Sequence, residues 1–489
     1  MLLLAMGCGG GTSSGTGGGG GATTGGGGGA ATGGGGGTTG GGSGGGGGGM
    51  MVGTIVDVAA ANPDFSILVA AVQKAGLAAT LADTSKQFTV FAPTNSAFTA
   101  LLGQLGITNG LDGLSAEQLK PILLYHVLGA EVRAAAATTA ATANQKVDAL
   151  GGKVQLSLSG SSIKLDGRAS VVMADVSASN GVIHVIDQVI LPSITDIATT
   201  DARFSSLAAA LALADTGTPA PNLVATLDDD AAAGFTVFAP TNDGFTALVN
   251  ALKGADDGAT TGITALTSFR ADQVLPVLKY HVVAGRVLAK DVPATGRVDT
   301  LGGKVDVTRS GATVTVDGTN VVIADVLASN GVIHAIGSVI LPSITDVVTT
   351  DGRFGALKGA VVAADADGAT SPKVATALDG TQRFTLFAPT DASFAALPAV
   401  PSGQALTNVL LYHAAPGNPV YASAALSLTS PLSVSTALTN KSFSVAAEGS
   451  PKAVTIADGT ATKAKVVATD VFCANGVIHV VDKVLLPAP

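Results

Sequence analysis

Residues 88–95 read FTVFAPTN, and this stretch decides the fold because it returns as FTVFAPTN at 235–242 and as FTLFAPTD at 384–391. Two further landmarks follow each copy in the same order. A Tyr-His pair comes first, at 125–126, 280–281 and 412–413, and then N-G-V-I-H, at 180–184, 330–334 and 475–479. A period of about 150 residues is far too long for a solenoid repeat. The sequence therefore predicts three tandem domains.

Composition excludes several classes of protein. The 489 residues are 47% hydrophobic and 12% charged, which does not fit a disordered polyelectrolyte. A net charge of −9 argues against a nucleic-acid binder. The absence of Trp disfavours a carbohydrate cleft lined with stacked rings. No apolar stretch reaches the roughly 18 residues of a membrane-spanning helix.

The first 49 residues differ from the rest, since they contain 29 of the 65 glycines. Residues 1–8 read MLLLAMGC and resemble the end of a bacterial lipoprotein signal peptide, in which the cysteine is acylated. This interpretation makes Cys8 a lipidation site, and the alternative is a chance cysteine in a disordered segment. Residues 9–49 are predicted to be a disordered tether with a reach of roughly 35 Å.

Local signals place the landmarks on elements of structure. We expect helices at 55–61 and 64–75, a strand at 88–91 ended by Pro93, an N-cap at Thr94 or Asn95, and a capping box of Ser115 with Gln118. The second half of each repeat has the pattern of strands. Two-residue hairpins are expected at Gly151-Gly152, Gly302-Gly303, Asp166-Gly167, Asp317-Gly318 and Asp458-Gly459. The strand after Asn180-Gly181 is apolar on both faces, which places it inside the fold.

The three landmarks together resemble tandem fasciclin domains, over about residues 51–489. The resemblance implies an α+β fold in which each domain is a β-sandwich or wedge with helices packed on one side. We place the domains at 51–192, 193–342 and 343–489, because Leu-Pro ends the last strand of a repeat and Thr-Asp begins the next helix. Members of this family are typically non-enzymatic adhesion proteins that are secreted, in the matrix or membrane-anchored.

The resemblance also implies candidate partner-binding residues. In animal members an Asp-Ile pair before the last strand and the Tyr-His neighbourhood are linked to integrin binding. The matching positions are Asp175, Asp325 and Asp470, with Tyr125, His126, Tyr280, His281, Tyr412 and His413. The chain contains no Arg-Gly-Asp sequence. The alternative for each Tyr-His pair is that the tyrosine packs its ring and the histidine caps the last helical turn.

The N-G-V-I-H landmark is interpreted as structural. Its members are Asn180, Gly181, His184, Asn330, Gly331, His334, Asn475, Gly476 and His479. Each histidine is expected to be a buried neutral imidazole; metal ligation, or a catalytic pair with Asp187 or Asp482, is the alternative. Residues 228–230 and 365–368 faintly resemble calcium loops, but solvated loops are expected. Cys473 is expected to be a small buried hydrophobe.

The sequence thus predicts a non-enzymatic adhesion protein without metal or cofactor. Its expected partners are cell-surface or matrix proteins or polysaccharides, with the membrane contacted only through the lipid anchor and no nucleic acid bound. Its expected location is extracellular or in a bacterial cell envelope. Two alternatives remain, a carrier of an apolar small molecule or pigment, and a hydrolase, for which no repeat shows a nucleophile with its base.

Overall fold

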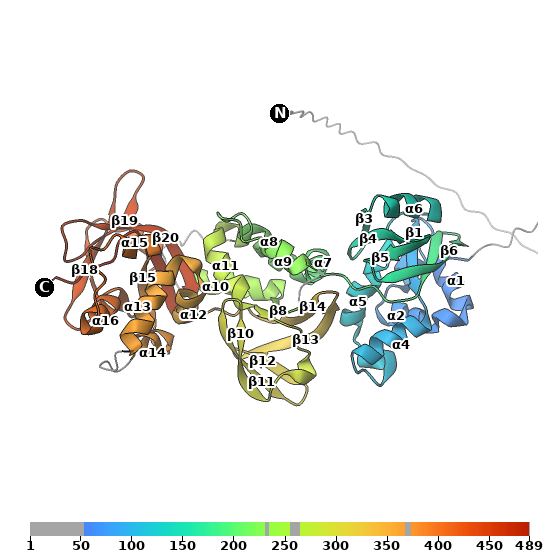
Figure 1. The fold of residues 1–489 in the computed structure, drawn as a ribbon, viewed down its shortest axis with the longest axis horizontal. Coiled ribbons are helices and arrows are strands. Elements are labelled where there is room, and N and C mark those ends of the chain that lie inside the picture. Colours follow the sequence, from blue (N-terminus) through green and yellow to red (C-terminus); the bar gives the residue numbers. More distant parts are fainter. Residues whose placement is uncertain (1–52, 230–233, 255–264, 367–372, 489) are drawn as a thin grey trace, which may run out of the picture. The chain divides into compact units, whose positions relative to one another are not determined.

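The computed structural model describes residues 53–229, 234–254, 265–366 and 373–488. The chain divides into two units, residues 1–50 and 51–489, and the second unit contains three repeats of one fold (Figure 1). The predictions for Cys8 and for the glycine-rich segment 9–49 lie outside the described residues. The first repeat runs from α1 to β7, the second from α7 to β14 and the third from α12 to β21.

The helices of each repeat lie mostly before its sheet. In the first repeat they are α1 (Ile55–Ala61), η1 (Pro63–Phe65), α2 (Ser66–Lys74), α3 (Ala78–Leu81), α4 (Asn95–Gln104), η2 (Gly110–Gly113), α5 (Ala116–Tyr125) and α6 (Ala134–Thr142). In the second they are α7 (Ile194–Thr200), η3 (Ala202–Phe204), α8 (Ser205–Ala214), α9 (Leu223–Asp228), α10 (Asn242–Gly254), η4 (Leu266–Ser268), α11 (Ala271–Tyr280) and η5 (Ala289–Asp291). In the third they are α12 (Ile344–Thr350), η6 (Gly352–Phe354), α13 (Gly355–Ala366), α14 (Val374–Asp379), α15 (Asp391–Ala395), α16 (Gly403–Tyr412) and α17 (Ala422–Leu426).

Among the described residues, each repeat has seven strands that form its sheet. The first repeat has β1 (Phe88–Pro93), β2 (Val127–Leu128), β3 (Lys146–Ala149), β4 (Gly152–Ser159), β5 (Ser162–Leu165), β6 (Ala169–Ala178) and β7 (Gly181–Ile186), closed into a barrel. The second has β8 (Phe235–Pro240), β9 (Val282–Ala284), β10 (Thr295–Thr300), β11 (Gly303–Ser310), β12 (Thr313–Val316), β13 (Thr319–Ala328) and β14 (Gly331–Ile336). The third has β15 (Phe384–Pro389), β16 (Ala414–Pro416), β17 (Leu432–Ser435), β18 (Ser442–Glu448), β19 (Ala453–Ala457), β20 (Ala464–Cys473) and β21 (Gly476–Val481). The predicted α+β fold is confirmed.

The first and last landmarks pair with each other. Strand β1 runs parallel to β7, with Phe88 opposite Gly181 and Phe91 opposite His184. The strands β8 with β14 and β15 with β21 pair in the same register. All six residues of β7 are buried, as the apolar pattern on both faces predicts.

A close approach of backbones explains why each last strand begins with glycine. A Cβ atom added at Gly181 would overlap the carbonyl oxygen of Phe88, and one added at Gly476 would overlap that of Phe384. Both glycines also have a positive φ, +142° and +156°. The N-G turn is therefore required for the parallel pairing of the two landmarks.

Most local predictions hold, but only one of the hairpins forms as predicted. The two Gly-Gly turns are shifted by one residue, because Ala149 pairs with Gly152 and Thr300 with Gly303. The Thr94 side chain caps α4, and Ser115 forms a capping box with Gln118 at the start of α5. The residues Asp317 and Gly318 form the predicted two-residue hairpin between Val316 and Thr319. The Asp166-Gly167 turn is one residue longer, because the strands pair at Leu165 and Ala169. The hairpin at Asp458 is wrong, since residues 458–463 separate β19 from β20.

Asp458 has a different role from the predicted turn. Its carboxylate accepts hydrogen bonds from the backbone N–H groups of Thr460 and Leu486 and from the Lys483 ammonium group. The three donors lie on the connecting loop and on the C-terminal segment. The carboxylate of Asp458 therefore holds the longer loop to the C-terminal segment.

The apolar core of each repeat lies between its first helices and its landmark strands. In the first repeat Phe65, Leu68, Val90, Leu119 and Ile183 belong to one buried cluster. Cys473 lies in the corresponding cluster of the third repeat, where burial raises the pKa of its thiol, as expected for a small buried hydrophobe. Within the described residues no single helix is long and apolar enough to cross a membrane, and α1 with η1–α2 meets the length and composition criteria only as a pair bent by 108°.

Candidate functional site

One buried histidine, His126, caps the C-terminal end of α5. The His126 side chain is 1% exposed, and its Nε2 accepts the N–H of Ile190 at 3.2 Å. Its Nδ1 lies 2.7 Å from the carbonyl oxygen of Ile122, so Nδ1 holds the proton and donates to that oxygen. Burial lowers the pKa of His126 to about 4, and the same cause lowers the pKa values of His281 and His413 to about 4. These rings are neutral helix caps.

The tyrosine of each pair is also buried. The hydroxyl groups of Tyr125, Tyr280 and Tyr412 donate to backbone carbonyl oxygens at 3.0, 3.0 and 2.9 Å. Their side chains are 2–4% exposed. The packing alternative describes this geometry, so the Tyr-His side chains are not part of the binding surface that we propose below.

The second histidine holds a bulge in the neighbouring strand. The ring of His184 is buried in β7; its Nδ1 accepts the N–H of Asp175 at 3.2 Å and its Nε2 donates to the carbonyl oxygen of Val132 at 2.8 Å. Asp175 adopts a left-handed conformation, φ +59°, beside a register shift in β6. Its Oδ1 accepts the N–H of Ala134 at 2.9 Å, at the start of α6. We call this arrangement the Asp bulge.

The Asp bulge occurs in every repeat. Asp325 and Asp470 have φ values of +55° and +58°, and their N–H groups donate to His334 and His479 at 3.2 and 3.3 Å. Burial lowers the pKa values of both histidines. Because the ring nitrogens of these histidines bond to the backbone, neither is free to bind a metal ion.

The asparagine of the last landmark joins three segments. The side chain of Asn180 is fully buried. Its Oδ1 accepts the N–H of Ile55 at 2.8 Å, and its Nδ2 donates to the carbonyl oxygen of Leu81 at 2.8 Å. Asn330 and Asn475 make the equivalent bonds to the first helices of their own repeats. These bonds tie the start of the last strand to the first helix of its repeat, and the structural role of the landmark stays a prediction.

The alternative sites do not assemble. Asp187 accepts the backbone N–H of Ser170 at 2.7 Å rather than a proton of His184. Asp228 accepts the hydroxyl group of Ser193, and Asp365 accepts backbone N–H groups. Residues 230 and 367–368 of the faint calcium loops lie outside the described residues. Among the residues that the structure describes, no group of three or more His, Cys, Asp or Glu could hold a metal ion.

Exposure distinguishes the three Asp bulges. Asp175 and its neighbour Met173 are exposed, Met173 at 58%, whereas Val172 is exposed in the same way as its counterparts Val322 and Val467. The side chains of Asp325 and Asp470 are less exposed, at 29% and 16%, and burial raises the pKa of Asp470. The first repeat therefore presents the bulge aspartate to solvent, whereas in the second and third repeats the preceding repeat partly covers it.

The comparison with family models decides the classification. The fasciclin domain model matches residues 63–192, 202–342 and 366–487. The chain belongs to the fasciclin family. This family is non-enzymatic, so the hydrolase alternative is not retained.

Fasciclin relatives occur in bacteria and animals. Protein sll1483 of Synechocystis sp. is 46% identical over 139 residues, which are 28% of this chain and 73% of the relative. Human periostin is 27% identical over 423 residues, 82% of this chain and 43% of periostin. The immunogenic protein MPB70 of Mycobacterium bovis is 33% identical over 136 residues, 27% of this chain and 65% of the relative. The chain thus covers less than half of periostin's length.

One solved structure is also similar. It is a FAS1 domain pair from the insect cell adhesion molecule Fasciclin I, and it shares 16% sequence identity with this chain at a TM-score of 0.27. The match covers 60% of this chain and 97% of the insect chain.

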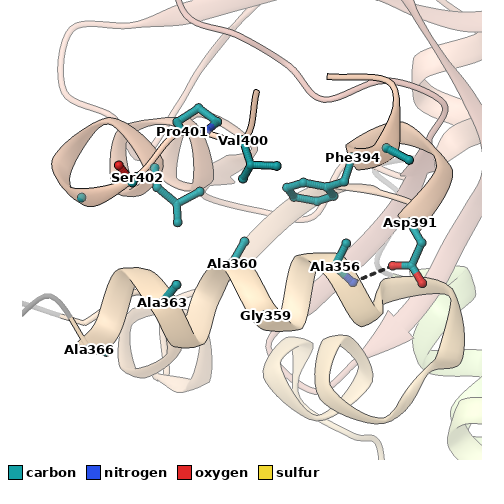
Figure 2. A pocket seen from close by; sticks show the side chains of 13 residues that line it. Ala356, Gly359, Ala360, Ala363, Ala366, Asp391, Phe394, Val400, Pro401 and Ser402 are labelled. Atoms are coloured by element: carbon teal, nitrogen blue, oxygen red, sulfur yellow. Dashed lines mark hydrogen bonds between the residues drawn. The ribbon is translucent and has the colours of Figure 1, made fainter. Parts of the chain in front are cut away.

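A hollow of about 850 Å³ lies in the third fasciclin repeat. Figure 2 shows Ala356, Ala360 and Ala363 of α13 on one side, and Phe394 and Val400 on the other. The connection that closes this side of the first repeat is residues 94–115, whereas in the third repeat it is the shorter segment 390–402. Residues of that shorter connection line the hollow.

Sequence reasoning missed two kinds of residue. Thr89 is 1% exposed, donates to the carbonyl oxygen of Ala130 and accepts the N–H of Val132, both at 2.7 Å. Its presence in every FT[VL]F copy was the available signal. Gln118 and Gln273 contact the following repeat, and no pattern within one repeat identifies that role.

Proposed function

We propose that this chain is a non-enzymatic adhesion protein of the cell surface or extracellular matrix that binds protein or polysaccharide partners through its fasciclin domains. The observation that carries the proposal is the match of all three repeats to the fasciclin family, whose typical role is adhesion. Three similar domains in one chain suit several weak contacts with a polymeric partner, because avidity then depends on effective concentration.

The exposed Asp bulge of the first repeat is the proposed partner-binding face. It combines the carboxylate of Asp175 with the exposed apolar side chains of Val172 and Met173. Such a mixture of apolar and polar groups is common at transient interfaces. Asp325 and Asp470 occupy the same position but are covered. We therefore place partner binding on the first repeat.

We also propose that the chain is exported and anchored through Cys8. An acylated cysteine inserts its chains into a bilayer, with about 0.8 kcal/mol contributed by each buried CH₂. The glycine-rich residues 9–49 would then hold the domains roughly 35 Å from the lipid. Mass spectrometry of the native N-terminus tests this proposal, since acylation adds a defined mass to Cys8.

An attachment assay tests the adhesion proposal. Cells that carry the wild type, Cys8→Ser, Asp175→Asn or Asp325→Asn are compared with cells that lack the protein. We expect Asp175→Asn to reduce attachment and Asp325→Asn, the same change at a covered bulge, to leave it unchanged. Equal attachment by cells with and without the protein would refute adhesion.

A cavity in the third repeat favours a second candidate function, the carriage of an apolar small molecule. It has a volume of about 260 Å³, and its lining includes Ala425, Val434, Val445 and Val454, with His479 in its wall. This size and lining are near the range of small-molecule sites. Co-purification of a chromophore that is lost in Val434→Phe, which fills the cavity, would support this candidate over adhesion.

A further inference from the structure

Consecutive repeats contact each other through one repeated set of side chains. Gln118 of α5 donates its Nε2 protons to the carbonyl oxygens of Ala324 and Asp325, at 2.8 and 3.3 Å. Gln273 of α11 donates in the same way to Thr469 at 3.2 Å. Ala324 and Thr469 both precede the aspartate of an Asp bulge. The helix of one repeat thus covers the bulge of the next.

An apolar side chain fills each junction. Leu327 of β13 is 1% exposed and packs with Leu105 and Ile122 of the first repeat. Phe472 of β20 packs edge-to-face on Phe269 of the second repeat, with ring centroids 5.6 Å apart. These two positions are equivalent, since each lies two residues after the bulge aspartate. Each is flanked by a second apolar residue, Leu288 in one junction and Tyr421 in the other.

An arginine extends each junction. Arg203 of η3 donates to the carbonyl oxygen of Glu117 at 3.3 Å, and Arg353 of η6 lies 3.7 Å from the carboxylate of Asp272. Each arginine directly precedes a buried phenylalanine in the second helix of its repeat, η3 or η6. Each reaches back to the first turn of the preceding α5 or α11.

A capping carboxylate completes the set. The Oδ1 atoms of Asp196 and Asp346 accept the N–H groups of Lys153 and Lys304, both at 3.1 Å. A Cβ atom on Gly152 would clash with Asp196, and one on Gly303 with Asp346. The glycine hairpins of the first two repeats therefore make room for the next repeat.

The first repeat keeps the capping carboxylate, as Asp57, but lacks three other side chains that dock backward in the later repeats. Asp64 stands where Arg203 and Arg353 stand, directly before the buried phenylalanine. Arg133 replaces Leu288 and Tyr421, as the residue before the N–H donor to the bulge aspartate. Ser177 replaces Leu327 and Phe472, two residues after the aspartate.

The third repeat lacks the residues that dock forward in the first two repeats. Ala405 replaces Gln118 and Gln273, seven residues before the tyrosine of the Tyr-His pair. Gln404 replaces the acidic residues Glu117 and Asp272. The glycine hairpin is also missing, since residues 436–441 connect β17 to β18. The first repeat thus lacks most of the backward-docking side chains, and the third lacks most of the forward-docking ones.

We propose that the junction is an ordered interface, and that these end residues prevent the first repeat from docking onto the third repeat of a second copy. Docking such ends would bury Arg133 without the apolar contact of its counterparts and would leave the bulge carbonyls without an amide donor. A head-to-tail contact that does not close makes open filaments, which the end residues avoid. The outer face of the first repeat is consequently free for a partner other than this chain.

The first test introduces residues of the first repeat at the junction positions of the second repeat, in the full chain. Leu288→Arg with Leu327→Ser gives the second repeat the residues of the first. We expect protease cleavage within residues 187–193 to be about tenfold faster, which corresponds to ~1.4 kcal/mol of lost docking free energy. We also expect a larger radius of gyration by X-ray scattering. Val322→Ser, at a 55% exposed position of the same strand, is the matched control. A double variant as compact and resistant as the wild type would overturn the ordered interface.

The second test introduces junction residues at the equivalent positions of the first and third repeats that lie outside the two junctions. The changes are Asp64→Arg, Arg133→Leu, Ser177→Leu, Gln404→Glu and Ala405→Gln. By sedimentation velocity we expect a monomeric wild type and oligomers of the five-fold variant that grow with concentration. All five changes lie outside the junctions, so the inner array serves as an internal control. A wild type that already associates head to tail, or a variant that stays monomeric at all concentrations, would overturn the proposal.

Discussion

Acid should destabilise each repeat through its helix-capping histidine. The His126 ring is neutral in the fold because Nε2 accepts the N–H of Ile190, and a proton added at Nε2 would abolish that bond. Burial lowers its pKa from 6.5 to about 4. A difference of about 2.5 in pKa corresponds to about 3 kcal/mol at 1.36 kcal/mol for each tenfold change.

The sign follows from proton binding. Between pH 6.5 and about 4 the unfolded chain binds a proton on His126 and the folded chain does not, so the free energy of unfolding falls as the pH falls. The contribution is complete above pH 6.5 and is lost progressively toward pH 4. For a domain with a stability of about 5–15 kcal/mol, a loss of about 3 kcal/mol is large.

The assay uses ¹³C-labelled histidine in the full chain, which has six histidines. We expect the ring signals to show that His126, His281 and His413 stay unprotonated down to about pH 5. The free energy of unfolding measured in urea should fall between pH 6.5 and 4. His126→Gln, a side chain that does not titrate, should reduce the pH slope of the first repeat. A His126 ring that titrates near 6.5 in the folded chain, or an unfolding free energy that is constant from pH 7 to 4.5, would refute the reasoning.

Three other predictions concern the landmarks. Gly181→Ala should prevent folding of the first repeat, because the new Cβ atom overlaps the carbonyl oxygen of Phe88, and circular dichroism will show this loss. The control Gly160→Ala, at φ +64° with open space around its Cβ, should lower the free energy of unfolding by only about 1 kcal/mol. Asn180→Ala should lower the unfolding free energy by about 2–4 kcal/mol in urea titrations, since two buried backbone groups lose their partner. Cys473 should resist thiol reagents in the native chain and react on unfolding, as peptide mass spectrometry will show; rapid native labelling would contradict its burial.

The fold could be predicted because the informative residues are local. Pro93 and the N-G turns mark the ends of strands, and Ser115 with Gln118 marks a helix start. The parallel pairing of β1 with β7 could not be predicted, since it joins segments about ninety residues apart with no local signal. The turn at Asp458 was mispredicted because Asp-Gly favours a hairpin only when strands flank it directly.

The candidate site was predicted only in part. The burial of His184 follows from its apolar neighbours, but its bond to Asp175 requires the left-handed bulge, which sequence does not reveal. The contrast between exposed Asp175 and covered Asp325 depends on a side chain of another repeat, Gln118. Three nearly identical motifs therefore have different surroundings, and only the structure distinguishes them.

The Asn180 bonds have a mechanical consequence. The chain enters the first repeat at Gly53 and Ile55, which bond to Ser179 and Asn180 at the start of β7, and it leaves from the far end of that strand. A pulling force between the two ends of the repeat therefore acts along β7, and it loads the hydrogen bonds to parallel β1 in shear, all at once rather than one by one. In the next repeat Ile194 bonds to Asn330 at the start of β14 in the same way. Tension thus passes from the last strand of one repeat to the last strand of the next, which suits a chain of domains that must stay folded under load.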